Sequence, residues 1–402
     1  MIGGGVPGER LARPVFGFQA ATLLLSAALL MFAIRPEAFE PYQTYELGLT
    51  LEHGLFVLSM LFCGLSFGMR PWPNLPAVAI AIILGYDLLL SDLAPGVDLG
   101  RMLSSAGLLL LPFVIPHVVL EPGSRRFLAT VCGVVPLVSL LLGFGLGIDR
   151  SLDDDYASWF KTYRITGAVG DSGYLGLLAF CAVVVSFNEA MRPRRRYMFL
   201  LSLAASAVML ASGVRMALLA TLIFAVAFAF AHPTVQGKLR SHVKGLLAGL
   251  LLLTAFLAYL TPAILERTLP ETFDFSTRDL VWEVFTDDLK GSLVFGRGFG
   301  ADAVVGQDAL SMYKRRSPFS IYLHLLVVGG LVGLALMSFA IAHWYRCILR
   351  SAAEMDQPFL IALAPALLVL GVTEEILTFS GMLVLWTYIG VLYVAPGRRL
   401  LQ

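Results

Sequence analysis

The segment 318–343, PFSIYLHLLVVGGLVGLALMSFAIAH, carries no Asp, Glu, Lys or Arg side chain. An α-helix rises 1.5 Å per residue, so about twenty apolar residues cross the ~30 Å hydrocarbon core of a bilayer. Comparable apolar runs recur along the 402-residue chain, and hydrophobic residues make up 58% of it. Only 14% of the residues are charged, and the mean hydropathy is +0.80. Because soluble domains carry about a quarter charged residues, the composition predicts an all-α polytopic membrane protein.

About twelve transmembrane helices are predicted, within one transmembrane domain that covers 1–402. They are placed at 15–34, 47–68, 74–93, 102–120, 127–147, 173–191, 197–213, 216–232, 245–264, 318–343, 358–377 and 380–395. With the N-terminus inside, more than half of the 29 Lys and Arg residues fall in short cytoplasmic segments. The positive-inside rule therefore places both termini in the cytoplasm.

Charge and cysteine content exclude some other classes. The net charge of +1 gives no indication of nucleic-acid binding. The four cysteines lie in or beside apolar runs without CxxC or metal-ligand spacing, which favours a packing role. No metal site is predicted, and Asp87 within the third span is interpreted as a structural partner.

Two outer segments are long enough to carry a site, namely 148–172 and the large periplasmic loop 265–317. Within the large loop, apolar residues in STRDLVWEVFTDDL (276–289) have helical spacing. This pattern predicts a short amphipathic helix that lies on the membrane surface or on the bundle. The following FGRGFGADA is interpreted as a glycine-rich turn.

Four outer-side arginines are candidate anion ligands: Arg164 in YRITG, Arg215 in SGVRMA, Arg278 in STRDLVW and Arg297 in FGRGFG. An arginine near hydrocarbon costs a few kcal/mol even on the lenient insertion scale. Arg215 stands in a tight turn between two apolar runs with no acidic residue nearby in sequence. One interpretation is that it snorkels or pairs with an acid of another span. The other is a phosphate site, because a guanidinium offers a planar fork of donors and keeps its charge.

Several motifs follow one another in a family-like order. The motif R-x-T-G occurs in RITGAVGDSGYLGLLAF (164–180), and S-x-x-R occurs in AVMLASGVRMALLATLIF (207–224). They are followed in order by TRDLVWEVFTDDLKGSLVFGRGFG (277–300), IYLHLLVVGGLVGLAL (321–336) and GVTEEIL (371–377). Over about 160–395 this order resembles the O-antigen polymerase/ligase superfamily.

The resemblance implies an inner-membrane glycosyltransferase that needs no metal, cofactor or nucleotide sugar. Its donor would be a glycan on a polyprenyl diphosphate, and its acceptor a hydroxyl of a glycan or of lipid A-core, at the periplasmic face. Arg164, Arg215 and Arg278 match family arginines, and Arg297 joins them as a candidate diphosphate ligand. A base would deprotonate the acceptor, and the sugar would transfer with inversion in lipopolysaccharide or other polysaccharide synthesis.

The general base is not fixed by the resemblance, because the family's His-Asn pair falls on Phe319 and Ser320. His324 lies one turn beyond Ser320 on the same helical face and is the first candidate. The plainer interpretation is a neutral histidine that a neighbouring helix satisfies. Carboxylates are the rival bases, with Glu374 first; the others are Glu375, Asp171, Glu283 and Asp279.

Two other functional classes stay open. A transporter or flippase of an anionic lipid-linked glycan would use the arginines along a translocation path, and predicts inverted repeats with broken helices near the midplane. A non-catalytic membrane scaffold would tolerate them as packing residues. The missing His-Asn pair weakens the assignment as a lipid A-core ligase specifically and leaves polymerisation of repeat units just as open.

Overall fold

The computed structural model is all-helical over the residues that it describes. These are 58, 75–90, 102, 106–107, 109–110, 113, 122–147, 165–169, 172–192, 195–232, 282–287, 289–299, 320–374, 376–377 and 382–392. The labelled helices are α3 (Leu75–Leu90), α5 (Pro122–Gly145), α7 (Ser172–Ala190), α8 (Tyr197–Ser212), α9 (Arg215–Ala231), α13 (Ile321–Ser351), α14 (Gln357–Thr373) and α15 (Leu383–Leu392). Two 3₁₀ turns, η4 (Gly167–Val169) and η6 (Leu289–Gly291), and a short helix at 282–287 complete them.

Among these helices, three are long and apolar enough to cross a membrane: Arg125–Gly145 in α5, Ser172–Ala190 in α7 and Ile321–Ser351 in α13. Eight of the predicted spans coincide with labelled helices, from α3 to α15. The predicted spans 15–34, 47–68, 102–120 and 245–264 lie wholly or mostly outside the described residues. The chain therefore contains several membrane-length apolar helices.

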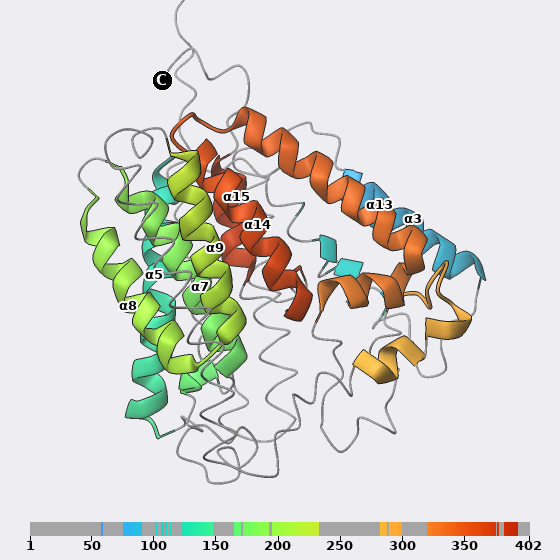
Figure 1. The fold of residues 1–402 in the computed structure, drawn as a ribbon, viewed down its shortest axis with the longest axis horizontal. Helices are drawn as coiled ribbons and strands as arrows, with labels where there is room; N and C mark the ends of the chain where they lie inside the picture. The colour runs from blue at the N-terminus through green and yellow to red at the C-terminus, as the bar shows by residue number, and fades with distance from the viewer. Residues whose placement is uncertain are drawn as a thin grey trace, which may run out of the picture.

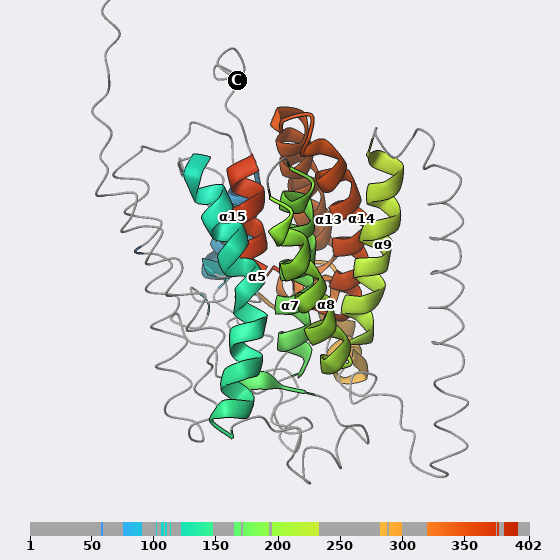
Figure 2. The ribbon, with the colours of Figure 1, turned by 90° about the vertical axis from the view of Figure 1, so that its left-hand side faces the viewer.

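The helices pack into a bundle in which α5, α7, α8 and α9 run alongside one another (Figures 1 and 2). Helix α14 packs against α9, and α15 packs against α5 and α7, while α13 extends away from the bundle and packs on α3. Small side chains permit close approach: a Cβ on Gly176 of α7 would lie 2.5 Å from Val214, which follows α8. The α7–α8–α9 region is therefore tightly packed.

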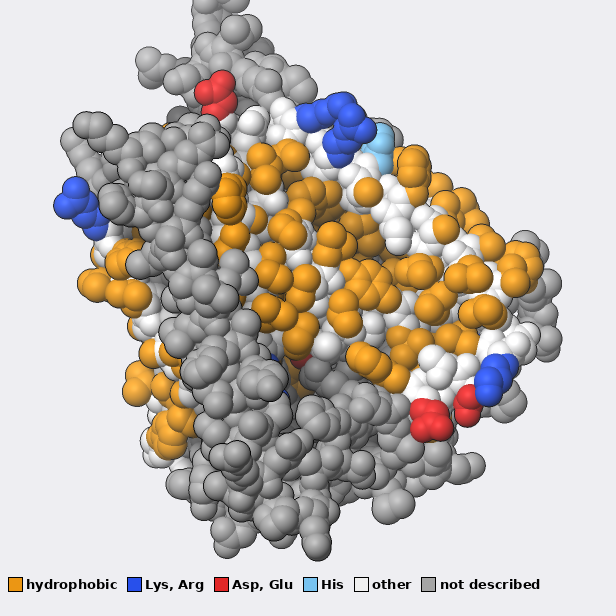
Figure 3. All heavy atoms as spheres, viewed as in Figure 1, with side chains coloured by type: hydrophobic (Ala, Val, Ile, Leu, Met, Phe, Trp, Pro, Cys, Tyr) orange, Lys and Arg blue, Asp and Glu red, His pale blue; other side chains and the backbone are white. Residues whose placement is uncertain are grey.

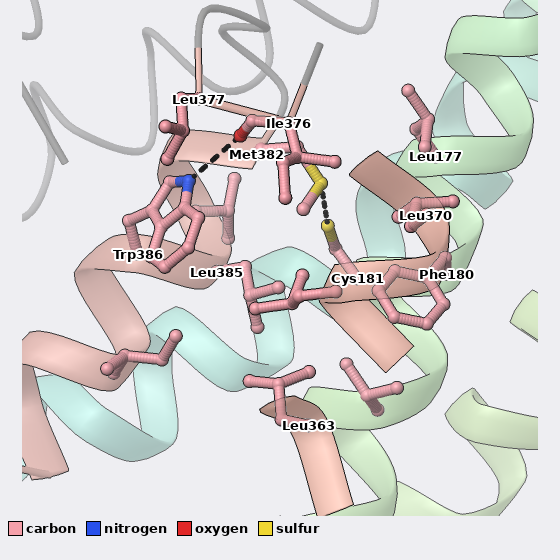
Figure 4. Packing of buried hydrophobic residues seen from close by; sticks show 14 of the residues in the cluster. Leu177, Phe180, Cys181, Leu363, Leu370, Ile376, Leu377, Met382, Leu385 and Trp386 are labelled. Carbon is pink, nitrogen blue, oxygen red and sulfur yellow. Dashed lines mark hydrogen bonds between the residues drawn. The ribbon is translucent and has the colours of Figure 1, made fainter. Parts of the chain in front are cut away.

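The centre of the bundle is an apolar core of buried side chains. In Figure 4, Cys181 of α7 points at Met382, with 3.3 Å between the two sulfur atoms, and Trp386 donates its indole N–H to the Ile376 carbonyl at 3.1 Å. Leu363 and Leu370 of α14 pack around the same region. Cys132 and Cys181 are buried free thiols, as the sequence predicted from their apolar surroundings.

The bounds of α13 differ from the predicted span 318–343. The helix continues to Ser351, eight residues beyond the predicted end, and passes through Arg346 and Arg350. The predicted span ended before Arg346, the first charged residue after it. The hydrogen bonds of a helix, however, can continue beyond the hydrocarbon core, as they do here. Helix α13 also has non-helical backbone at Gly330, with φ 61° and ψ −161°. The short segment 321–329 therefore points in a different direction from the rest of α13 (Figure 1).

Candidate functional site

Two ends of the bundle can be distinguished by the antiparallel pair α9 and α14. Phe224 of α9 packs on Phe359, near the start of α14, with 5.8 Å between ring centroids. The Arg215 end is the end where α9 begins and α14 terminates. The Asp356 end is the opposite one, where α14 begins and α7 terminates. Three of the predicted site residues that the structure describes, Arg215, His324 and Glu374, belong to the Arg215 end.

Arg215 is the first residue of α9 and is exposed. Gly213 closes α8 in the left-handed conformation with φ 66°, and Val214 precedes α9 in extended conformation. No side chain caps the N-terminus of α9. A long helix presents unsatisfied N–H groups and a positive dipole end there, so the guanidinium and the helix terminus favour an anion at the same place.

The RITG segment is attached to this turn. Ile165 donates its backbone N–H to the carbonyl of Ala211, at the end of α8, over 3.3 Å. Gly167 has φ 59°, and a Cβ there would lie 2.9 Å from Ser139 Oγ of α5. Arg164 lies outside the described residues. Its neighbour Ile165 is bonded to Ala211, which precedes Arg215 by four residues. The R-x-T-G segment and the S-x-x-R turn, two of the motifs described above, therefore lie next to each other.

His324 lies in the segment 321–329 of α13, before the break at Gly330, which is called the half-helix below. This half-helix packs on the last turns of α14. Ser320 caps this half-helix by accepting from Leu323 N at 3.4 Å, and His324 N donates to the Ser320 carbonyl at 2.8 Å. Tyr322 donates its hydroxyl to the Leu368 carbonyl at 2.8 Å. A Cβ on Gly371 would lie 2.9 Å from Ile321, so glycine permits this contact. The His324 side chain is buried, with 2% exposure.

Glu374 terminates α14 three residues after Gly371, in extended backbone, and is also buried. The structure thus brings Arg215, His324 and Glu374 to one end of the bundle, on α9, α13 and α14. Glu375, Asp171 and Asp279 lie outside the described residues, as does Arg278. Glu283 lies on the 282–287 helix.

Arg297 occupies a different place from the other candidates. Its backbone N–H donates to Val327 at 2.7 Å, at the far end of the half-helix that begins beside Ser320. The short helix before it packs on the same half-helix, because Phe285 and Leu289 form a cluster with Leu323 and Val327. The helix predicted within 276–289 is thus observed at 282–287, and it packs on the first segment of α13.

The Asp356 end holds a buried network of charges that was not predicted from the sequence. Arg125 of α5 donates Nη1 to Asp356 Oδ2 at 2.7 Å and Nη2 to Asp356 Oδ1 at 2.6 Å. Its Nε also donates to Glu189 of α7. Tyr388 of α15 accepts from Arg125 at 3.0 Å and donates to Glu189 at 2.7 Å. Glu189 has no exposed surface, so this charge near the end of the predicted span 173–191 lies in the protein interior.

Two further arginines complete this network. Arg192 donates to both Asp356 oxygens, at 2.9 and 3.1 Å, and Arg195 pairs with Glu189. The Asp356 network comprises Arg125, Asn188, Glu189, Arg192, Arg195, Asp356 and Tyr388. Burial acts to raise the pKa of Asp356, but the hydrogen bonds and charges of Arg125 and Arg192 outweigh it and hold this pKa below its usual value.

The two ends differ in what they offer to a ligand. Each carboxylate of the Asp356 network is already bound by two arginines or more, so this network ties α5, α7, α14 and α15 together. The sequence signal for it was Glu189 in the last turn of the predicted span 173–191 and Asp356 just before the later span 358–377. The Arg215 end instead combines an exposed cation with a helix N-terminus, and is the candidate site. No group of three or more potential metal ligands occurs among the described residues.

Comparison with known proteins identifies no relative. No protein-family model, no curated protein and no solved structure matches this chain.

Proposed function

We propose that this chain is a bacterial inner-membrane glycosyltransferase of the O-antigen ligase or polymerase type. It would have about twelve transmembrane helices, cytoplasmic termini and a periplasmic active site at the Arg215 end. The observation that carries the proposal is the hydrogen bond from Ile165 to Ala211, which joins the RITG segment to the turn before Arg215. It is further supported by two buried titratable side chains, His324 and Glu374, at the same end of the bundle.

The chemistry assigned to these groups follows from charge. The acceptor oxygen attacks the anomeric carbon from the face opposite the diphosphate, and the C–O bond to phosphate breaks with its electron pair passing to the diphosphate. Arg215 and the N-terminus of α9 stabilise the negative charge that develops on the leaving group, with Arg164, Arg278 and Arg297 as further candidate ligands. His324, or in its place Glu374, accepts the proton of the acceptor hydroxyl.

A second candidate function has one observation in its favour. Helix α13 is broken at Gly330, and discontinuous helices are typical of secondary transporters. A flippase of an anionic lipid-linked glycan would use the same cationic end to bind diphosphate. The broken helix here has its freed backbone groups bonded by a neighbouring loop, which supports a fixed element more than a moving gate.

The test is glycan transfer by purified protein in detergent, with polyprenyl-diphosphate glycan as donor and either a second donor or lipid A-core as acceptor. We expect wild type to form product, Arg215→Ala to lose it, and Arg346→Ala, an exposed arginine on α13, to retain it. Product from Arg215→Ala at the wild-type rate would contradict the diphosphate role. Absence of product from folded wild type, with translocation of the donor in liposomes, would instead establish the flippase.

A further inference from the structure

The break in α13 exchanges two helical hydrogen bonds for four bonds to a neighbouring loop. In a regular helix the Val327 and Val328 carbonyls would accept from Leu331 and Val332. Here Val327 accepts from Arg297 N at 2.7 Å and Val328 from Gly298 N at 2.9 Å. The freed amides of Leu331 and Val332 donate to the Leu293 carbonyl at 2.9 Å and the Val294 carbonyl at 3.1 Å. These four backbone groups of α13 are thus bonded within the protein.

The break is also placed at the depth of the membrane. Arg346 is an exposed charge on the same helix, sixteen residues after Gly330. At 1.5 Å per residue this separation is about 24 Å, and tilt makes the depth smaller. The hydrocarbon core is about 30 Å thick, so with Arg346 at one membrane surface Gly330 lies inside it. Non-helical backbone at such depth must be bonded internally, and the loop supplies those bonds.

The loop presents apolar side chains outward at this place. Leu293, Val294 and Phe295 are each about half exposed, and so are Leu331 and Val332 on α13. A contiguous exposed patch of this kind is unusual on a face in water. Phe295 stacks on Tyr86 of α3, with 5.5 Å between centroids, so the patch continues onto the neighbouring helix.

Charged side chains bracket the same segment. Lys290 is exposed and pairs with Asp287 at 2.7 Å, three residues before Leu293, and Arg297 follows Phe295 by two. In Figure 3 apolar side chains cover most of the length of α13 and the right-hand side of the view, and charged side chains lie at the lower right edge. Flanking long cationic side chains can reach the interface while their neighbours contact hydrocarbon. Because Lys290 and Arg297 lie close together in the sequence, only a short tip between them can insert.

We propose that 293–295 forms a re-entrant tip that inserts into lipid hydrocarbon beside α3 and α13. The partner of this surface is the acyl chains of the surrounding bilayer. The tip is held in place by the four backbone bonds to the α13 break and by Asp87 of α3, whose carboxylate accepts from Phe299 N at 2.9 Å. This explains why the segment after the 282–287 helix is apolar although it belongs to a loop predicted to be periplasmic. The inference requires that α13 crosses the membrane and is independent of any enzymatic activity.

The test is nitroxide accessibility in the full chain, reconstituted into phosphatidylcholine–phosphatidylglycerol liposomes. Single cysteines are introduced as Val294→Cys and Phe295→Cys in a chain with Cys63 and Cys347 replaced by Ser; Cys132 and Cys181 are buried. Lys290→Cys is the aqueous control, and Phe339→Cys on the exposed face of α13 is the lipid control. Leu293→Cys serves as a third tip position if one variant does not fold.

We expect spin labels at the tip to relax through oxygen and not through the aqueous nickel complex, as at position 339. The label at position 290 should show the reverse. Tip labels that respond to nickel as strongly as position 290 would overturn the proposal, because the segment would then be in water. Labels shielded from both reagents would overturn it as well, because protein and not lipid would then cover the tip.

Discussion

Removing the charge of Asp356 is expected to destabilise the folded protein strongly. Asp356→Asn keeps the size of the side chain but replaces one carboxylate oxygen by an N–H₂ group that faces the donors of Arg125 and Arg192. Asp356 accepts two hydrogen bonds from each of these arginines. Breaking one partner of a buried ion pair costs about 3–5 kcal/mol, because the remaining charge is left uncompensated. We expect a loss of this size and not the sum of four separate hydrogen bonds, since bonds within one network are not additive.

The assay is reversible unfolding in mixed micelles, with the free energy of unfolding obtained from the transition. Glu354→Ala is the matched control, since Glu354 is an exposed acid in the same connection, and its effect should stay within about 0.5 kcal/mol. A double-mutant cycle with Arg125→Met should give a coupling energy of about 0.5–3 kcal/mol. A loss below about 1 kcal/mol for Asp356→Asn would refute the assignment of this network as the main tie between the helices.

The sign of the pH dependence follows from the same carboxylate. Its pKa is lowered in the folded state, so its contribution to stability is present above the unfolded pKa of 3.8 and is lost as the pH falls through the folded pKa. Wild type should therefore lose more stability below about pH 4 than Asp356→Asn does.

Two further predictions concern α13. Gly330→Ala should lower the free energy of unfolding by about 1–3 kcal/mol or more, because φ 61° with ψ −161° is a conformation essentially restricted to glycine and the added Cβ would lie 2.4 Å from Val294. Gly333→Ala, whose Cβ would make an ordinary 3.5 Å contact with Ile83, is the control, and equal stability of the two variants would contradict the strain argument. His324→Ala should reduce glycan transfer by about 10²–10⁴-fold, the loss typical of an acid–base group. The control for this transfer assay is His343→Ala, at an exposed histidine of α13. Near-normal turnover of His324→Ala with intact stability would assign the role of base to Glu374.

Some structural roles could be predicted from single residues of the sequence, and others could not. Gly329 and Gly333 of α13 face Ile83 of α3, and a Cβ on either would make an ordinary contact of 3.4 or 3.5 Å, so the contact between the two helices does not require glycine there. The structural role predicted for Asp87 is confirmed by its bond from Phe299. The break at Gly330 was missed, because an apolar pattern carries no information on backbone φ. The roles predicted for the arginines, His324 and Glu374 remain predictions.

The sequence by itself determined where the apolar helices lie. Hydropathy is a local property, and a run of about twenty apolar residues forms a helix in hydrocarbon whatever its neighbours are. Only the tertiary structure decided which charges are buried. Arg125 and Glu189 are 64 residues apart, and Arg125 and Tyr388 are 263 apart, so no window of sequence contains the network. The same holds for the α13 break, whose stability depends on bonds from a separate loop that supplies the partners the helix itself has lost.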